Sequence, residues 1–237
     1  MIKFLLSFIW GACLGSFLTV ITHRIQKDPM GIITGRSTCP HCKNKLKAQD
    51  LIPILSYIYY KGKCRMCENQ IDKKYPIIEL ITAMLFAILT VKFTLIEILI
   101  LSPLFILFLA NVYQDAFSQQ VESKLLYMLC VVSFIYGSWF FGHNINHVFI
   151  FGLIGFSFFY IQELLNENII GDADSYVGLT IGFLFASMKT LTSIFIAYWI
   201  AVLTVVPYFY MKYKSIKNRK VALIPFLFTG FYLNLIF

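Results

Sequence analysis

Four cysteines have the types and spacing of a metal site. They form two CxxC pairs, Cys39-Pro-His-Cys42 and Cys64-Arg-Met-Cys67, within one short polar stretch. Two such pairs about twenty residues apart match a tetrahedral Cys₄ zinc ribbon, in which each pair supplies two thiolates. The spacing therefore predicts one structural Zn²⁺ ion held by Cys39, Cys42, Cys64 and Cys67. A redox-active CxxC pair is the alternative.

Three aspartates at the borders of apolar stretches form a second candidate site. Asp115 ends one stretch, while Asp172 and Asp174 open a later one. Two aspartates brought together can share a proton, so that one acts as general base and the other as general acid on a water molecule. The alternative is that these residues cap helices, since Asp is a good N-cap. No Ser-His-Asp, HExxH or P-loop pattern competes in the sequence.

Glu79 is a further acidic residue near an apolar stretch, just after Pro76. An ionisable group near membrane depth is costly, which makes it a functional candidate. We expect Glu79 to reach a basic group on the same side of the membrane and to support chemistry without performing it.

The composition predicts an integral membrane protein. Of the 237 residues, 59% are hydrophobic and 14% charged, and the mean hydropathy is +0.74. A helix needs roughly 17–25 apolar residues to cross a bilayer. Eight stretches qualify or come close: 4–23, 76–92, 94–113, 123–141, 147–164, 175–190, 191–210 and 221–236. The predicted fold is an all-α polytopic membrane protein with about eight transmembrane helices and a small cytoplasmic zinc-ribbon loop between helices 1 and 2.

The basic residues predict the orientation in the membrane. Eleven lie between Arg24 and Lys74, Lys27 among them, and five more lie between Lys212 and Lys220. Basic loops stay in the cytoplasm, which places 24–75, 114–122, 165–174 and 211–220 inside and the N-terminus outside. The net charge of +8 is then a topology signal directed at the lipid bilayer, and nucleic acid is not an expected partner.

A cytoplasmic loop also favours metal over disulfides, because the cytosol keeps thiols reduced. The two remaining cysteines, Cys13 and Cys130, lie within apolar stretches and are expected to be buried small hydrophobic residues.

Several segments together carry a family pattern. They are Gly15-Ser16-Phe17-Leu18-Thr19-Val20 followed by Arg24, Arg36–Cys42, Leu51–Tyr57, Gly62–Arg65, Tyr75-Pro76-Ile77-Ile78-Glu79 and Ile224-Pro225-Phe226. In these segments the chain resembles the type IV prepilin peptidases, a family of membrane aspartic proteases with a GxGD-type motif. The first segment has Thr19 where the family usually has Asn.

The resemblance also points to two catalytic aspartates. Asp115, with Val121 six residues later, is similar to the family's first motif, D-x₅-[IV]-P, although Glu122 replaces the proline. Gly171-Asp172-Ala173-Asp174 is similar to the second motif and points to Asp174, with Asp172 as the alternative. The family's usual lysine two residues further on is replaced here by Tyr176.

The resemblance implies a two-step membrane enzyme in the prokaryotic cytoplasmic membrane. It would remove the leader of type IV prepilins or pseudopilins, which serve pili, secretion and competence, on the cytoplasmic face. It would then N-methylate the new N-terminus with S-adenosylmethionine. The implied parts are a first transmembrane helix (1–24), a cytoplasmic Cys₄ zinc-binding loop (25–75) and a membrane aspartic-protease domain (76–237). Two alternatives remain: a zinc-ribbon membrane scaffold or small transporter, and a peptidase homologue that lacks one activity.

Overall fold

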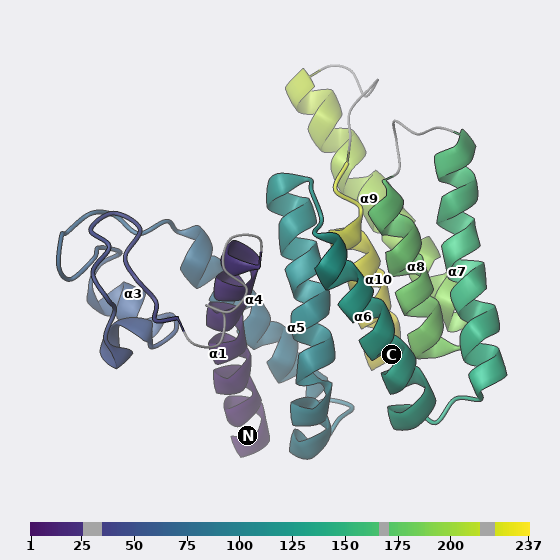
Figure 1. The fold of residues 1–237 in the computed structure, drawn as a ribbon, viewed down its shortest axis with the longest axis horizontal. Coiled ribbons are helices and arrows are strands. Elements are labelled where there is room, and N and C mark those ends of the chain that lie inside the picture. The colour runs from purple at the N-terminus through teal and green to yellow at the C-terminus, as the bar shows by residue number, and fades with distance from the viewer. Residues whose placement is uncertain (26–34, 166–170, 214–220) are drawn as a thin grey trace. The chain divides into compact units, whose positions relative to one another are not determined.

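The computed structural model describes residues 1–25, 35–165, 171–213 and 221–237 as a set of helices (Figure 1). The chain divides into two compact units, Met1–Ile106 and Leu107–Phe237. The described residues form no strand; two isolated bridges, Thr38–Lys45 and Lys63–Gln70, lie in the polar loop. Lys27 and the basic residues from Lys214 to Lys220 lie outside the described residues.

The first unit consists of a helix pair, the polar loop and the start of α5. Its helices are α1 (Ile2–Arg24), the short helices η1 (Ala48–Leu51) and α3 (Leu55–Tyr59), α4 (Lys74–Leu89) and the beginning of α5 (Leu95–Ser118). α1 packs closely on α4 along a face with Gly11 and Gly15: a Cβ at Gly15 would lie 2.8 Å from the Cα of Glu79. Small residues at i and i+4 let two helix backbones approach in a membrane, where packing drives association.

The prediction for Cys13 is wrong, because its side chain is exposed. Cys13 lies two residues from both Gly11 and Gly15, so it is on the opposite side of α1 from the face that packs on α4. Cys130 is partly buried and its Sγ lies 3.7 Å from the Tyr176 carbonyl oxygen.

The second unit is a helical bundle. It contains the end of α5, α6 (Ser123–Ile135) continued by the π-helical turn η2 (Tyr136–Phe140), α7 (Ile145–Leu165), α8 (Asp172–Phe185), α9 (Lys189–Tyr213) and α10 (Ile224–Ile236). α8 lies against α7 at Gly155 and Gly178, where a Cβ on either glycine would collide with the backbone of the other. This close approach fixes α8 one turn after Asp174.

The helices agree with the predicted membrane-crossing stretches. Each of the eight stretches coincides with a helix of the described chain. Five of these helices are long and apolar enough to cross a membrane: α1, α5, α6 with η2, α7 and α9. The other three, α4, α8 and α10, have 16, 14 and 13 residues. A helix of about 20 residues matches a bilayer, so these three are short for a crossing. The protein is thus a polytopic helical membrane protein.

Candidate active site and metal centre

Asp115 lies in the last turn of α5 and is partly buried. Its Oδ2 accepts a hydrogen bond of 3.0 Å from the backbone N–H of Ile224, the first residue of α10. The first N–H groups of a helix have no partner within the helix, so α10 has a donor free for this carboxylate. The same two helices pack through Phe108, whose ring stacks on Phe231 at 5.4 Å.

The turn after Asp115 is held by Gln114, which sequence analysis did not single out. The backbone N–H of Glu122 donates to Gln114 Oε1 at 2.8 Å. A proline at this position, as in the family pattern, has no N–H to donate. The replacement of that proline by Glu122 is therefore matched by a new contact on the neighbouring side chain.

Asp174 lies in the first turn of α8 and is only 7% exposed, whereas Asp172 is exposed. The Oδ2 of Asp174 accepts a hydrogen bond of 3.1 Å from the backbone N–H of Gly171. The backbone N–H of Asp174 in turn donates to the Gly171 carbonyl at 2.9 Å. This reciprocal pair is a capping arrangement. The N-cap of α8 is Gly171 and not an aspartate, so the alternative of an aspartate N-cap is wrong; Asp174 is the third residue of the helix and supports the cap from there. This role alone does not require the carboxylate to be buried.

The two carboxylates have related surroundings. Both lie at helix ends in the second unit, and the charge of Asp115 acts on Asp174, as does that of Glu163. In each aspartate Oδ2 is held by a backbone N–H. The Oδ1 atoms have no hydrogen-bond partner among the described residues and remain able to bind water or a peptide group. This arrangement suits two carboxyl groups that act on one water molecule.

The four cysteine thiols of the loop converge. Their Sγ atoms all lie within 4.8 Å of one another, and those of Cys39 and Cys67 are 3.9 Å apart. A tetrahedron with Zn–S bonds of about 2.3 Å has sulfur–sulfur edges of about 3.8 Å, so the spacing fits a zinc ion. The donor set, four free thiols without a disulfide, is also that of a structural zinc site.

The two cysteine pairs share one local geometry. Each begins with a cysteine whose N–H bonds to an asparagine carbonyl five residues on, Asn44 for Cys39 and Asn69 for Cys64. A hydrogen bond from the Asn69 backbone lowers the pKa of the Cys67 thiol. Desolvation and the three neighbouring thiols raise this pKa by more, so that it lies at about 11. Such a group keeps its proton at neutral pH unless a cation takes the proton's place, as zinc does.

Glu79 joins the loop to the helix pair. Its Oε2 accepts a 2.7 Å hydrogen bond from the backbone N–H of Ile54, and the Ser16 hydroxyl also bonds to it. Among the described residues Glu79 has no basic partner, contrary to expectation: its partners there are a backbone amide and a hydroxyl. Ile54 has φ +62°, and the Leu55 N–H bonds to the Pro53 carbonyl at 2.5 Å, so a tight γ-turn is held by this carboxylate.

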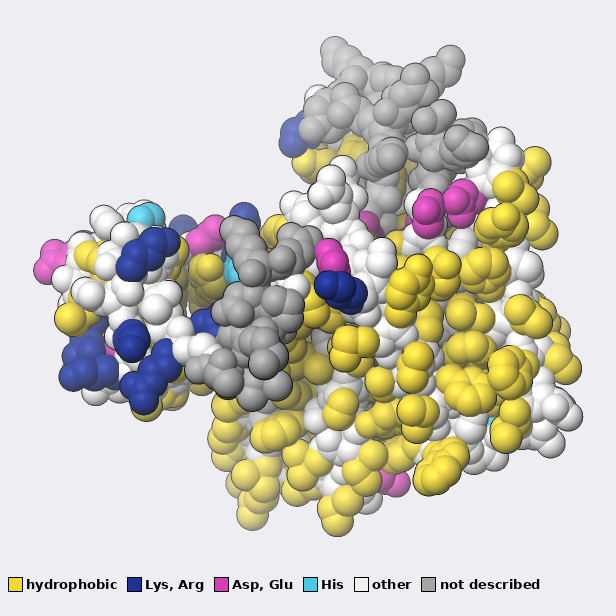
Figure 2. Space-filling view, in the orientation of Figure 1, with side chains coloured by type: hydrophobic (Ala, Val, Ile, Leu, Met, Phe, Trp, Pro, Cys, Tyr) yellow, Lys and Arg dark blue, Asp and Glu magenta, His cyan; other side chains and the backbone are white. Residues whose placement is uncertain are grey.

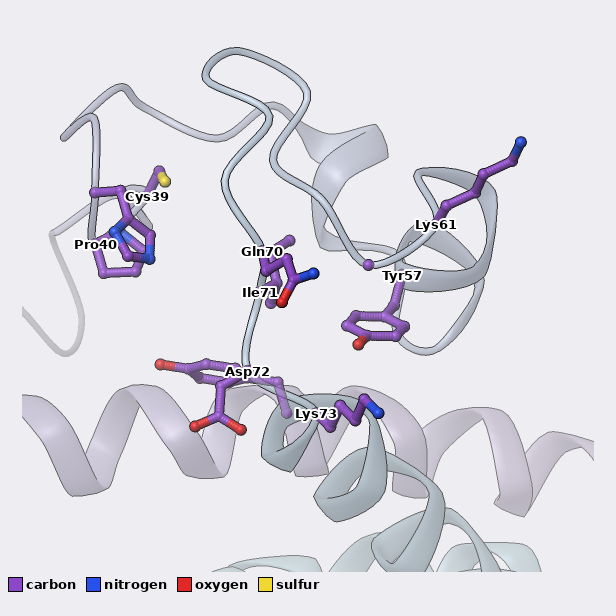
Figure 3. A pocket seen from close by; sticks show the side chains of 11 residues that line it. Cys39, Pro40, Tyr57, Lys61, Gln70, Ile71, Asp72 and Lys73 are labelled. Carbon is purple, nitrogen blue, oxygen red and sulfur yellow. The ribbon is translucent and has the colours of Figure 1, made fainter.

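A cavity of about 540 Å³ lies in the loop, between the first cysteine pair and the start of α4 (Figure 3). Its lining includes the rings of Tyr57 and Tyr75, the carboxylate of Asp72 and the side chain of Gln70. Burial raises the pKa of Tyr75, and the charge of Asp72 raises it further, so this phenol stays protonated at neutral pH. The lining also includes Lys61 and Lys73, and Asp72 pairs with Lys74 at 3.6 Å. The cavity thus offers aromatic surface, hydrogen-bond donors and charged groups of both signs to a water-soluble ligand.

Comparison with known proteins identifies the N-terminal part of the chain. Residues 9–93 match the family described as Bacterial Peptidase A24 N-terminal domain. A prepilin leader peptidase/N-methyltransferase of Bacillus subtilis is 45% identical over 86 residues, which are 36% of this chain and 34% of the relative. A protein of the same name from Aeromonas hydrophila is 32% identical over 105 residues, 35% of this chain and 36% of the relative.

A third relative of that name, from Myxococcus xanthus, is 40% identical over 79 residues, 33% of this chain and 23% of the relative. The matches with these three therefore span about a third of the relatives' length or less. No solved structure matches the chain. The family match includes the four cysteines and Glu79 but ends before Asp115. Residues 9–93 are therefore similar to a bacterial A24 peptidase N-terminal domain, and this match supports the resemblance to type IV prepilin peptidases over this part of the chain.

Proposed function

We propose that the protein is a membrane aspartic endopeptidase that removes the leader of type IV prepilins or pseudopilins on the cytoplasmic face of a prokaryotic membrane. The observation that carries this proposal is the pair Asp115 and Asp174. Both are withdrawn from solvent at helix ends, each has one oxygen held by a backbone N–H, and their charges interact. The A24 domain at residues 9–93 and the names of the relatives support it.

The proposed mechanism uses the two free carboxyl oxygens. Two neighbouring carboxylates do not both ionise at low cost, so in this proposal the pair holds one proton between them. The ionised member takes a proton from water as the water attacks the scissile carbonyl carbon. The protonated member donates to the carbonyl oxygen and later to the leaving amine. The oxygens bonded to Ile224 and Gly171 keep both groups in place during these transfers.

The burial of Asp174 supports it over Asp172 as the second catalytic residue. The carboxylate of Asp172 is exposed to water. A buried carboxylate senses a neighbouring charge more strongly, because the effective dielectric constant around it is lower. Only Asp174 combines burial with an interaction with Asp115.

We propose that the loop cysteines, Cys39, Cys42, Cys64 and Cys67, hold a structural zinc ion. The ribbon has few buried apolar residues, and a bound metal contributes folding free energy to a domain of that kind. We further propose eight membrane crossings, with the short helices α4, α8 and α10 tilted little or locally thinning the bilayer. The N-terminus is then outside, and the loop and both aspartates face the cytoplasm.

The second proposed activity is N-methylation of the new N-terminus, which the relatives' names support. S-adenosylmethionine supplies the methyl group in this reaction. Its parts fit the lining of the 540 Å³ cavity: the tyrosine rings suit the adenine, and Asp72 suits the amino group or the ribose hydroxyls. In this proposal Tyr57 and Tyr75 orient the cofactor, and Gln70 donates or accepts one hydrogen bond.

Two alternative functions make different demands on the structure. A transporter would need ionisable residues within the middle of several crossing helices. Asp115 and Asp174 instead lie at helix ends, where water can reach them, which supports a protease at the membrane boundary. A homologue that lacks one activity differs only in its products, so measurement of cleavage and methylation separates it from the full enzyme.

The experiment co-expresses a candidate prepilin with the wild-type protein, with Asp174→Asn and with the matched control Asp172→Asn. Mass spectrometry follows the loss of the leader and the gain of one methyl group. We expect cleavage with wild type and Asp172→Asn and none with Asp174→Asn. Cleavage by Asp174→Asn at the wild-type rate, in protein expressed to the same level, would exclude the proposed dyad.

A further inference from the structure

A second cavity, of about 510 Å³, lies between α7 and α9 in the second unit and is here termed the α7–α9 cavity. Neither the proposed acid–base chemistry nor the metal site uses it. Its lining includes Phe158 and Gln162 of α7 and Leu191, Thr192, Phe195 and Tyr198 of α9. The cavity is thus mostly apolar, with a small number of groups that can form hydrogen bonds.

One end of the α7–α9 cavity lies beside Asp174. Helices α7 and α8 run antiparallel with Gly155 against Gly178, so Phe159, one turn after Gly155, is level with Asp174, one turn before Gly178. The ring of Phe159 stacks on that of Tyr198, with centroids 6.1 Å apart. The charge of Asp174 also acts on Tyr198. This tyrosine therefore joins the cavity to the proposed catalytic carboxylate.

Gln162 and Tyr198 form a polar pair at this end. The Tyr198 hydroxyl donates to Gln162 Oε1 at 2.9 Å, and Gln162 Nε2 donates to the Phe158 carbonyl at 3.1 Å. Within the described parts of the chain neither side chain forms another hydrogen bond, so the Tyr198 oxygen can still accept one and the second N–H of Gln162 can still donate one. A peptide group offers the matching N–H and C=O.

From the polar pair the cavity continues into the bundle, away from the end where Asp174 lies. Gln162 is three residues before the end of α7, and Asp174 is the third residue of α8. Figure 1 shows the end of α7 and the start of α8 at the same end of the second unit. Leu191 precedes Tyr198 by seven residues on α9, which is about 10 Å along the axis at 1.5 Å per residue. The apolar part of the cavity therefore lies deeper along the helices than the carboxylate.

This apolar part is open toward the lipid. Phe195 is 64% exposed and Phe158 37%, although both lie in helices that are long and apolar enough to cross a membrane. Figure 2 shows hydrophobic side chains over the face of the second unit that is in view, and acidic side chains near the end where α8 begins. A chain segment that is already within the bilayer can therefore enter the cavity from the side, without passing through water.

We infer that the α7–α9 cavity binds the apolar segment of the substrate on the C-terminal side of the scissile bond, and that Gln162 and Tyr198 bind the peptide backbone where this segment begins. The inference rests on the proposed function. If the leader is removed on the cytoplasmic face, the chain beyond the scissile bond is the part that continues into the membrane. A lipid chain would fill the apolar part of the cavity but offers no group to the polar pair.

The first test fills the cavity in the full-length protein, reconstituted in vesicles with a prepilin. Leu191→Trp adds bulk to the cavity wall. Leu153→Trp is the matched control, because Leu153 is exposed and lies nine residues, or about two and a half turns, before Gln162, on the opposite side of α7. We expect Leu191→Trp to raise KM at least about fivefold with kcat within about twofold of wild type, and Leu153→Trp to change neither. An unchanged KM in Leu191→Trp would overturn the inference.

The second test keeps the size of the side chain close to that of the original residue. The photo-reactive residue p-benzoylphenylalanine takes the place of Phe195 or, as control, of Tyr160. Tyr160 is two residues from both Phe158 and Gln162 and so lies on the opposite side of α7 from the cavity. Mass spectrometry identifies what each position captures on illumination. We expect capture of the prepilin's apolar segment at position 195 and little capture at position 160.

Two results of the second test would overturn the inference: capture of lipid alone at position 195, which would assign the cavity to the bilayer, and equal capture of the prepilin at both positions. Cleavage of the prepilin by the wild-type protein is measured in the same vesicles. Cleavage without capture at position 195 would overturn this inference and leave the proposed function standing, whereas absence of cleavage would remove both.

Discussion

Replacement of either aspartate by asparagine tests the dyad with little disturbance of the fold. Asparagine has nearly the same volume, and its carbonyl oxygen can still accept the N–H of Gly171 at position 174 or of Ile224 at position 115. The cap on α8, whose loss costs about 0.5–2 kcal/mol, is therefore retained. What disappears is the ability to hold and release a proton.

The expected loss is large because each group has two roles. General acid–base catalysis by one positioned side chain contributes about 10²–10⁴ in rate. In the proposed mechanism the two carboxyls share one proton, so either single change removes both the acid and the base function. We therefore expect Asp115→Asn and Asp174→Asn each to lower kcat/KM by at least about 10³-fold. The double variant should be hardly slower than either single one, because the pair acts as one unit.

The assay uses purified protein in detergent or vesicles, a synthetic prepilin segment and detection of the released leader by mass spectrometry. Asp172→Asn is the matched control, since it removes an exposed carboxylate two residues away on the same helix. Additive losses in the double variant would show that the aspartates act independently, and normal cleavage by Asp115→Asn would refute the mechanism. If Asp172→Asn alone abolished cleavage, the dyad would remain and its second member would be Asp172.

Three further outcomes follow from the first unit. Purified protein should contain about one equivalent of zinc. The Cys67→Ser variant should lose most of it, because metal binding and folding of the ribbon are coupled. Less than about a tenth of an equivalent in the wild-type protein, with disulfides present, would contradict the site. Glu79→Gln should retain part of the cleavage activity, since its amide oxygen can still accept the Ile54 N–H, and a loss as deep as in the aspartate variants at normal expression would give Glu79 a direct role. Gly62→Ala should weaken the binding of S-adenosylhomocysteine, measured by calorimetry, and leave leader cleavage intact. Gly62 has φ +71°, and a Cβ at this position would press on Tyr57. Unchanged binding would contradict the assignment of the cofactor to this cavity.

The helices and the convergence of the four loop cysteines could be predicted from the sequence because both depend on local information. Apolar stretches of bilayer length mark the helices, and the CxxC spacing alone specifies four thiols in one loop. Helix lengths were less accessible: α8 ends at Phe185, where Ala186 adopts a left-handed conformation with φ +44°, although apolar residues continue beyond it. Hydropathy does not report such a turn.

The partners of the acidic residues could not be predicted, because they are backbone groups distant in the chain. Glu79 bonds to the N–H of Ile54, 25 residues away, and Asp115 to that of Ile224, 109 residues away. A search for charged partners, such as the basic group expected for Glu79, misses these contacts since every residue type except proline carries an N–H. Only the packing of the helices decides which of the many amides meets a carboxylate.

The candidate site makes use of what helices leave unsatisfied at their ends. The first N–H groups of α8 and α10 have no carbonyl partner within their own helices, and one donor at each terminus holds one oxygen of an aspartate. In α10 the following residue is Pro225, which has no N–H and fits the first turn, and the donor to Asp115 is the Ile224 amide before it. Water can reach helix ends at the membrane boundary but not the middle of a crossing helix. A pair of carboxyls that exchanges protons with water, as the proposed mechanism requires, is therefore best placed at helix ends, and Asp115 and Asp174 each lie at one.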